Sequence, residues 1–173
     1  MIKFDQKIQI KMEDILIRTI EPEDNYALAK IIRDSLTEFN ANKPGTVYFD
    51  ETTDHLSDVF TVRNSIYYVA VRGNEIMGGA GIYPTENLPK GTCELVKLYL
   101  SPEARGKGLG RLLMEKCMAA AKEMGYQKIY LETMPELIIA VPLYKKLGFV
   151  VLPGPQGNSG HTGCDIWMIK DLY

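Results

Sequence analysis

Three alternate glycines most constrain how this chain can fold, because they stand in the segment Arg105-Gly-Lys-Gly-Leu-Gly-Arg111. The segment follows a stretch with strand character and precedes a long amphipathic stretch with helical spacing. Glycine reaches backbone conformations that are closed to other residues, so the chain can approach a ligand closely there. A helix that begins at this point directs unpaired N–H groups and the positive end of its dipole at the same place. With three cationic side chains around it, the segment predicts a strand–turn–helix unit that binds a diphosphate.

Two familiar phosphate-binding loops do not fit this spacing. A P-loop requires Ser or Thr directly after its Lys, whereas Gly108 follows Lys107. A dinucleotide fingerprint has its third glycine where Arg111 stands, and it belongs near the first strand of a parallel sheet. A tight strand-to-helix turn with incidental basic residues is the simpler alternative.

The predicted elements alternate as in a mixed α/β domain. Gly73-Asn74 separates two early strands and predicts a hairpin. Gly125 and Gly148 are expected to end the two late helices. Pro142 removes a backbone hydrogen bond inside the second of them, so we expect a late start or a kink there. The expected strands are 15–20, 65–71, 76–83, 92–100, 127–133, 149–152 and 164–169. The expected helices are 22–39, 53–60 (with Thr53 as its cap), 108–124 and 136–147.

Length and composition favour one domain. The 173 residues suit a single core, so we assign residues 15–173 to this domain and residues 1–14 to an N-terminal extension that lacks the apolar stretch of a signal peptide. A net charge of −2 argues against a nucleic-acid partner, and no apolar run approaches the roughly 20 residues that a membrane span needs. Cys93, Cys117 and Cys164 show no CxxC spacing, which predicts reduced thiols in a cytoplasmic protein and no metal site.

Around the glycine segment the sequence resembles the GCN5-related N-acetyltransferase (GNAT) family. Residues 98–110 read LYLSPEARGKGLG and are similar to the family's motif A, whose core is Q/R-x-x-G-x-G/A. Residues 140–149 read AVPLYKKLGF and are similar to motif B, at the usual distance downstream. Two matches in the right order are more specific than either alone. The resemblance covers residues 93–150 and extends through the order of elements over 15–170.

The resemblance implies the α/β GNAT acyl-CoA N-acyltransferase fold, a central mixed but mostly antiparallel sheet with flanking helices and one splayed pair of parallel strands. It implies acetyl-CoA as cosubstrate and no metal. The cofactor would enter between the strand that ends at Leu100 and the strand that begins at Gln127. Backbone amides of the glycine segment would bind the pyrophosphate, and the pantetheine arm would pair with the strand edge. The implied cofactor-binding residues are Leu98, Tyr99, Leu100, Arg105, Gly106, Lys107, Gly108, Leu109, Gly110, Arg111 and Thr133.

Glu94 is the candidate general base, because acetyl transfer requires a neutral amine and a base near the acceptor supplies it. Strand alternation places Glu94 on one face with the apolar side chains at positions 96, 98 and 100. The distance from Glu94 to Leu100 is roughly 20 Å at about 3.3 Å per residue, comparable to an extended pantetheine arm. The family often has a glutamate in this strand. The alternative is an edge carboxylate that lies in water or pairs with Lys97 or Lys128.

Tyr144 is the candidate general acid by resemblance, since the matching tyrosine lies close to the sulfur of CoA and can protonate the departing thiolate. The alternative is that Tyr144 only packs on an amphipathic helix. Motif B commonly has Asn seven residues earlier, and Leu137 stands there in this chain. We expect Thr133 or the backbone to replace that contact with the cofactor.

The residues that contact the amine acceptor are less clearly indicated by the sequence. His161, in the glycine- and proline-rich loop 153–163, either touches the acceptor, serves as a base or faces solvent. The acids of the segment 50–58 either attract a cationic amine or decorate the first turns of a helix: Asp50, Glu51, Asp54 and Asp58.

We expect direct transfer of the acetyl group to a primary amine of a small molecule, amino acid or protein, in a ternary complex, because no cysteine is placed as a nucleophile. The alternatives are a non-catalytic acyl-CoA-binding or sensor module and a nucleotide-binding protein. The resemblance also leaves a homodimer open, since many relatives pair through late strands.

Overall fold

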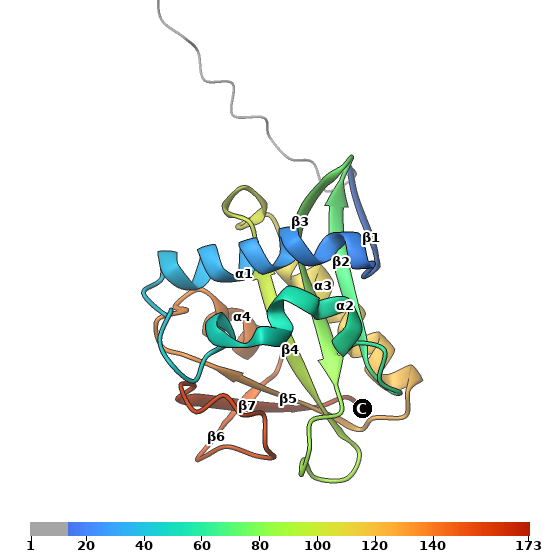
Figure 1. Ribbon diagram of the computed structural model, residues 1–173. Coiled ribbons are helices and arrows are strands. Elements are labelled where there is room, and N and C mark those ends of the chain that lie inside the picture. The colour runs from blue at the N-terminus through green and yellow to red at the C-terminus, as the bar shows by residue number, and fades with distance from the viewer. Residues whose placement is uncertain (1–13) are drawn as a thin grey trace, which may run out of the picture.

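A seven-stranded mixed sheet organises residues 14–173, the part of the chain that the computed structural model describes (Figure 1). Its strands are β1 (Ile15–Thr19), β2 (Ile66–Arg72), β3 (Glu75–Tyr83), β4 (Thr92–Leu100), β5 (Lys128–Thr133), β6 (Val150–Leu152) and β7 (Ile166–Asp171). They lie in the order β1-β2-β3-β4-β5-β7-β6. Neighbours run antiparallel except β4 and β5, which are parallel. The extension expected over 1–14 lies, apart from Asp14, outside the described residues and stays a prediction.

Four α-helices of the described chain cover the two faces of this sheet. They are α1 (Asn25–Glu38), α2 (Leu56–Val59), α3 (Leu109–Glu123) and α4 (Ala140–Lys146). In Figure 1, α1 and α2 lie on the near side of the sheet and α3 lies on the far side. Apolar side chains of α3 and α4 share one core cluster, and those of α1 and α2 share the other. The predicted mixed, mostly antiparallel sheet with flanking helices is confirmed.

The expected elements agree with the structure apart from two local differences. The last helix begins at Ala140 rather than at 136, so Pro142 lies in the first turn, where its missing N–H has no helical acceptor anyway. The expected late start is therefore confirmed. The expectation that Thr53 caps the short helix is wrong. Thr53 lies inside a 3-10 turn, Glu51–His55, and its hydroxyl donates a 3.0 Å hydrogen bond to the carbonyl of Val47.

β4 contains a β-bulge at Lys97. Its pairing with β3 passes from Val96 opposite Gly81 to Tyr99 opposite Gly79, so β4 carries one extra residue in this stretch. Lys97 has a φ of 51°, in the left-handed region that a lysine rarely adopts. The bulge therefore reverses which face of the sheet the later side chains of β4 occupy.

This reversal corrects the expectation that Glu94 shares a face with Leu98 and Leu100. Cys93 and Leu95, which flank Glu94, pack in the cluster on the α3 side. Leu98 and Leu100 pack in the same cluster, beyond the bulge. Glu94 therefore lies on the opposite face from the two leucines.

Tyr67 of β2 stabilises the bulge through a hydrogen bond. Its buried hydroxyl donates a 2.8 Å hydrogen bond to the carbonyl of Lys97. The ring passes over Gly79 and Gly81 of β3, where a Cβ atom would come within 2.5 and 2.6 Å of it. Two glycines of β3 thus make room for the tyrosine that holds the bulge in place.

We predict that Tyr67→Phe lowers the free energy of unfolding by about 1–2 kcal/mol, because the buried carbonyl of Lys97 loses its donor. Urea denaturation measures this change. Tyr68→Phe is the matched control, since the hydroxyl of Tyr68 donates no hydrogen bond among the described residues. Equal effects of the two substitutions would show that the bond to Lys97 does not stabilise the bulge.

Candidate active site

The parallel strands β4 and β5 separate soon after they begin to pair. Their pairing covers Thr92 to Glu94 on β4 and Lys128 to Tyr130 on β5. Beyond Glu94, β4 continues to Leu100 without pairing to β5. The predicted splayed pair is confirmed, and Glu94 stands where the two strands part.

A large apolar groove extends from this opening to the glycine segment. It has a volume of about 480 Å³ and is lined by parts of β4, the glycine segment and α4. Among the expected cofactor-binding residues it includes Leu98, Tyr99, Leu100, Arg105, Gly106, Gly108, Gly110 and Arg111. Leu109 is instead fully buried in the core, and Lys107 does not line the groove.

The glycine segment leaves backbone donors available at the start of α3. Gly106 and Gly108 have φ values of 74° and 87°, and a Cβ atom on either would meet nothing within 4 Å. The N–H of Leu112 donates to Gly108, whereas the N–H groups of residues 109–111 have no acceptor among residues 14–173. This is the open, positively polarised helix end that the sequence predicts, and its chemistry suits an anion.

The three basic side chains of the segment differ in their contacts. Arg105 donates to the carbonyl of Leu100, to Ser35 and to Glu38, and so ties the segment to β4 and α1. Arg111 is exposed and Lys107 is half-buried, and each contacts only a neighbour within four residues.

Glu94 is almost completely buried, with an exposed fraction of 3%. The hydroxyl of Thr85 donates to its carboxylate. Burial, and then the nearby charge of Glu132, raise the pKa of Glu94 to about 7. The alternative of a paired edge carboxylate is wrong, because Lys97 contacts Asp50 and Lys128 contacts Asp171.

His161 turns inward from the loop before β7. Its Nε2 lies 2.8 Å from Oδ2 of Asp50, and the ammonium of Lys97 lies 3.3 Å from the same oxygen. Burial opposes ionisation of Asp50, but the hydrogen bond to His161 and the charge of Lys97 together lower its pKa. The solvent-facing alternative for His161 is therefore wrong, since its side chain is only 16% exposed.

The other acids of the segment 50–58 do not enter the site. Asp54 forms a two-bond ion pair with Arg33, at 2.6 and 2.8 Å. Glu51 and Asp58 are exposed. Of the four acids considered, the structure brings only Asp50 to the candidate site.

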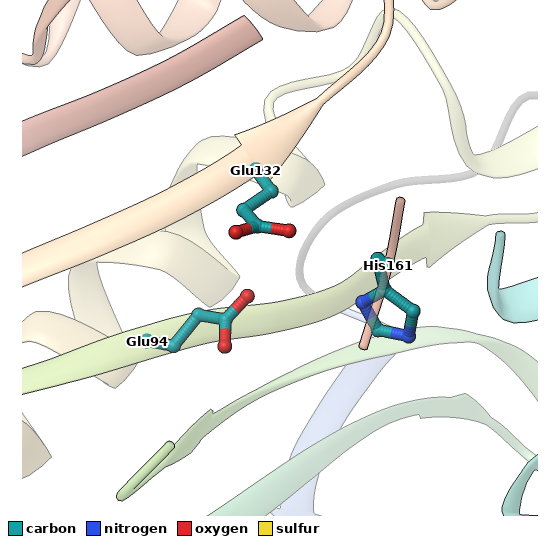
Figure 2. A group of neighbouring side chains, drawn as sticks. All are labelled: Glu94, Glu132 and His161. Atoms are coloured by element: carbon teal, nitrogen blue, oxygen red, sulfur yellow. The ribbon is translucent and has the colours of Figure 1, made fainter. Parts of the chain in front are cut away.

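Glu132 of β5 also belongs to the site and was not predicted from the sequence. One of its oxygens accepts a 2.7 Å hydrogen bond from Tyr130, and the other accepts one of the same length from Ser159. Figure 2 shows that Glu132, Glu94 and His161 point toward a common space. The available signal was the alternation of β5, which puts Tyr130 and Glu132 on one face of a strand expected beside Glu94.

These three side chains form the acid–base cluster of the site: Glu94, Glu132 and His161. One acceptor atom from each lies within 4.8 Å of the others, and carboxylates and imidazole are groups that metal ions bind. The carboxylates, however, already accept hydrogen bonds from Thr85, Tyr130 and Ser159. Both carboxylates of the cluster are thus already held by hydrogen bonds from neighbouring hydroxyl groups.

Two smaller cavities meet at Glu94. A polar cavity of about 290 Å³ lies between the β4 bulge, the segment 50–60 and the loop 153–163. A junction cavity of about 50 Å³ shares Glu94, Lys97 and His161 with the polar cavity and shares Tyr99 and Tyr144 with the apolar groove. A molecule in the polar cavity and one in the groove would therefore meet beside Glu94.

Tyr144 of α4 lies at the groove side of this junction. It is 7% exposed, and burial raises its pKa well above the ordinary value, so the phenol keeps its proton. Its hydroxyl has no hydrogen-bond partner within 14–173. Thr133 also lines the junction cavity, and its buried Oγ1 lacks a partner, as expected of a group that contacts a bound molecule.

Splayed parallel strands, an anion-binding helix start and a buried carboxylate at the junction together define an acyl-CoA N-acyltransferase. The sequence profile of the acetyltransferase (GNAT) family matches residues 26–149, so the chain belongs to this family. It is an acetyl-CoA-dependent N-acetyltransferase, and the predicted fold, family and cosubstrate are confirmed.

Individual relatives agree with this assignment. The chain is 36% identical over 159 residues to the uncharacterised N-acetyltransferase YjgM of Escherichia coli K12, covering 91% of this chain and 95% of the relative. It is 29% identical over 164 residues to the IAA acetyltransferase of Azospirillum brasilense, covering 93% of each.

Solved structures show the same fold. A GNAT-family acetyltransferase from Staphylococcus aureus Mu50 superposes with a TM-score of 0.81 at 19% identity, over 92% of this chain and 99% of that one. The PaiA N-acetyltransferase of Thermoplasma acidophilum, solved with coenzyme A, has a TM-score of 0.71 at 20% identity, over 91% of this chain and 98% of that one.

Within residues 14–173, no helix has the length and apolar character that crossing a membrane would require.

We predict that Glu94→Gln stabilises the protein at high pH. The neutral acid tolerates burial, so the stability associated with Glu94 is full below the ordinary pKa of 4.5 and is lost as pH rises through about 7. That rise in pKa corresponds to roughly 3 kcal/mol, which sets the upper limit of the gain. Urea denaturation of both proteins at pH 5 and pH 8 measures this gain. If the two proteins differ in free energy of unfolding by the same amount at both pH values, the prediction is contradicted.

Proposed function

We propose that the protein acetylates an amine directly in a ternary complex, with Glu94 as general base and Tyr144 as general acid. The observation that carries this proposal is the position of Glu94, a buried carboxylate with a pKa of about 7 at the meeting point of the polar cavity and the apolar groove. A base with this pKa is half ionised near neutral pH, where it can both accept and release a proton.

The groove supports a bound acetyl-CoA along its length. The free N–H groups of residues 109–111 would bind the diphosphate, and the exposed edge of β4 from Leu98 to Leu100 would hold the pantetheine arm. Thr133 offers a hydroxyl for the contact that Leu137 cannot make. This arrangement puts the thioester at the junction cavity.

The acceptor would enter through the polar cavity. Glu94 takes one proton from the ammonium form of the acceptor, and the nitrogen lone pair that this frees attacks the acetyl carbon. The carbon–sulfur bond breaks, and Tyr144 donates its proton to the thiolate. The nitrogen loses its second proton, which returns through solvent to the Tyr144 phenolate, and Glu94 releases its proton to solvent. The products are therefore an acetamide, CoA and one proton.

The cysteines support direct transfer without an acyl-enzyme. Cys164 lines the junction cavity, but burial raises the pKa of its thiol to about 12, so little nucleophilic thiolate forms. Cys93 and Cys117 are buried in the core on the α3 side. Because these three thiols are unpaired, we also propose a cytoplasmic location.

The proposed homodimer would use β6. This strand is the edge of the sheet, and its side chains Val150 and Val151 are 59% and 56% exposed. Exposed valines on an open edge favour pairing with a second copy.

The function is tested by thiol release from acetyl-CoA with a panel of amines. We expect kcat/KM of the wild type to rise with pH and level off above about 7, because Glu94 must lose its proton to act. Glu94→Gln should lose this pH dependence and reduce kcat roughly 100-fold or more.

Tyr144→Phe should reduce kcat about tenfold, since a thiolate leaves tolerably well unaided. Binding of acetyl-CoA without thiol release for any amine would favour the non-catalytic module instead.

The diphosphate site has a separate test in Gly108→Glu. The new carboxylate would lie in the groove beside the free N–H groups and repel the diphosphate. We expect acetyl-CoA affinity to fall at least tenfold in a calorimetric titration. Gly108→Asn is the control, because asparagine tolerates the φ of 87° and adds no charge. Unchanged affinity of Gly108→Glu for acetyl-CoA would show that the diphosphate does not bind at the glycine segment.

A further inference from the structure

The acid–base cluster brings three hydrogen-bond acceptors from three elements to one point of the cavity wall. Glu94 comes from β4, Glu132 from β5 and His161 from the loop before β7. Their acceptor atoms lie within 4.8 Å of one another, around the common space seen in Figure 2. Glu94 and His161 also line the polar cavity, so this space is open to a molecule bound there.

The spacing of these atoms suits a primary ammonium group. An R–NH₃⁺ group donates three hydrogen bonds in tetrahedral directions at about 2.9 Å, so its acceptors lie about 4.7 Å apart. The acceptor atoms of the cluster all lie within 4.8 Å of one another, a range that includes the separation expected around an ammonium.

Neighbouring groups orient all three acceptors. Tyr130 and Ser159 donate to Glu132, so both of its oxygens are fixed as acceptors. Asp50 accepts from Nε2 of His161. Figure 2 shows one ring nitrogen of His161 turned toward the glutamates and the other turned away. We assign the inward nitrogen to Nδ1, which in the neutral ring is an acceptor when Nε2 carries the proton.

The charges favour the same ligand. Two carboxylates face each other in a buried place, and the repulsion between them is relieved when a cation lies between them. Lys97 acts on Glu94 only through space, because its ammonium contacts Asp50. Neither Glu94 nor Glu132 forms an ion pair within residues 14–173.

We propose that Glu94, Glu132 and His161 form a three-acceptor subsite that binds the acceptor substrate as a primary ammonium and selects primary over secondary amines. Glu132 and His161 bind the ammonium, and Asp50 is a positioning residue that fixes the ring of His161. The inference rests on the proposed function in one respect, which is that Glu94 is the group that then removes one proton from the bound ammonium. A secondary ammonium has only two N–H donors, so it leaves one acceptor unsatisfied.

The test compares benzylamine with N-methylbenzylamine, since the polar cavity offers the rings of Phe60 and Tyr83 to an aromatic body. Thiol release gives kcat and KM, and calorimetric titration into the enzyme–CoA complex gives binding without turnover. We expect the wild type to bind benzylamine at least tenfold more tightly than its N-methyl derivative. Glu132→Gln and His161→Phe should weaken benzylamine binding about tenfold and reduce that preference, with the KM for acetyl-CoA unchanged.

Two further variants separate positioning from general charge effects. In Asp50→Asn the amide can donate to Nε2, which puts the ring proton on Nδ1 and turns an acceptor into a donor, so we expect the loss seen in His161→Phe. Glu51→Gln removes an exposed charge next to Asp50, outside the polar cavity, and should change benzylamine binding less than twofold. Thermal melting confirms that each variant is folded, and Glu132→Asp should restore part of the affinity.

The outcomes distinguish this inference from the proposed function. Equal affinity of the wild type for the two amines, or unchanged benzylamine binding in Glu132→Gln and His161→Phe, would overturn the subsite even if acetylation is observed. Selective benzylamine binding that depends on Glu132 and His161, with no thiol release by the wild type, would support the subsite and overturn the catalytic assignment alone.

Discussion

The bulge at Lys97 is the constraint on which the site depends. In a regular strand, the carboxylate of Glu94 and the leucines that line the groove would lie on one face of β4. The extra residue moves Glu94 to the opposite face from Leu98 and Leu100. One strand can therefore present a buried carboxylate to the polar cavity and an apolar edge to the groove, with the junction cavity between them.

The surrounding sheet contains features that stabilise little by themselves but hold this bulge. Gly79 and Gly81 contribute no side chain to the core, yet a Cβ atom on either would collide with the ring of Tyr67. Tyr67 in turn gives its hydroxyl to the carbonyl of Lys97. A lysine with φ of 51° and a buried ionisable glutamate both reduce stability. Both costs arise where β4 holds a buried carboxylate at the junction of the polar cavity and the apolar groove.

The sequence predicted well the parts of the site that are local in the chain. The glycine segment, the helix after it and the late start at Pro142 follow from residues within about ten positions of each other. The bulge could not be predicted this way, because alternation is the default assumption for a strand and nothing in the local sequence marks the extra residue. The error in the face of Glu94 followed directly from that assumption.

The acceptor side depends on long-range contacts, and there the sequence was less informative. Asp50 and His161 are 111 residues apart, and each had a solvent-exposed alternative when considered alone. The charges of the site must be considered as a set: Lys97 and His161 both contact Asp50, which leaves Glu94 and Glu132 without an ion-pair partner among residues 14–173. An isolated carboxylate would have indicated a base. A pair of them beside an oriented imidazole offers, in addition, the three acceptors that a protonated amine requires, and the proposed ammonium subsite depends on this combination.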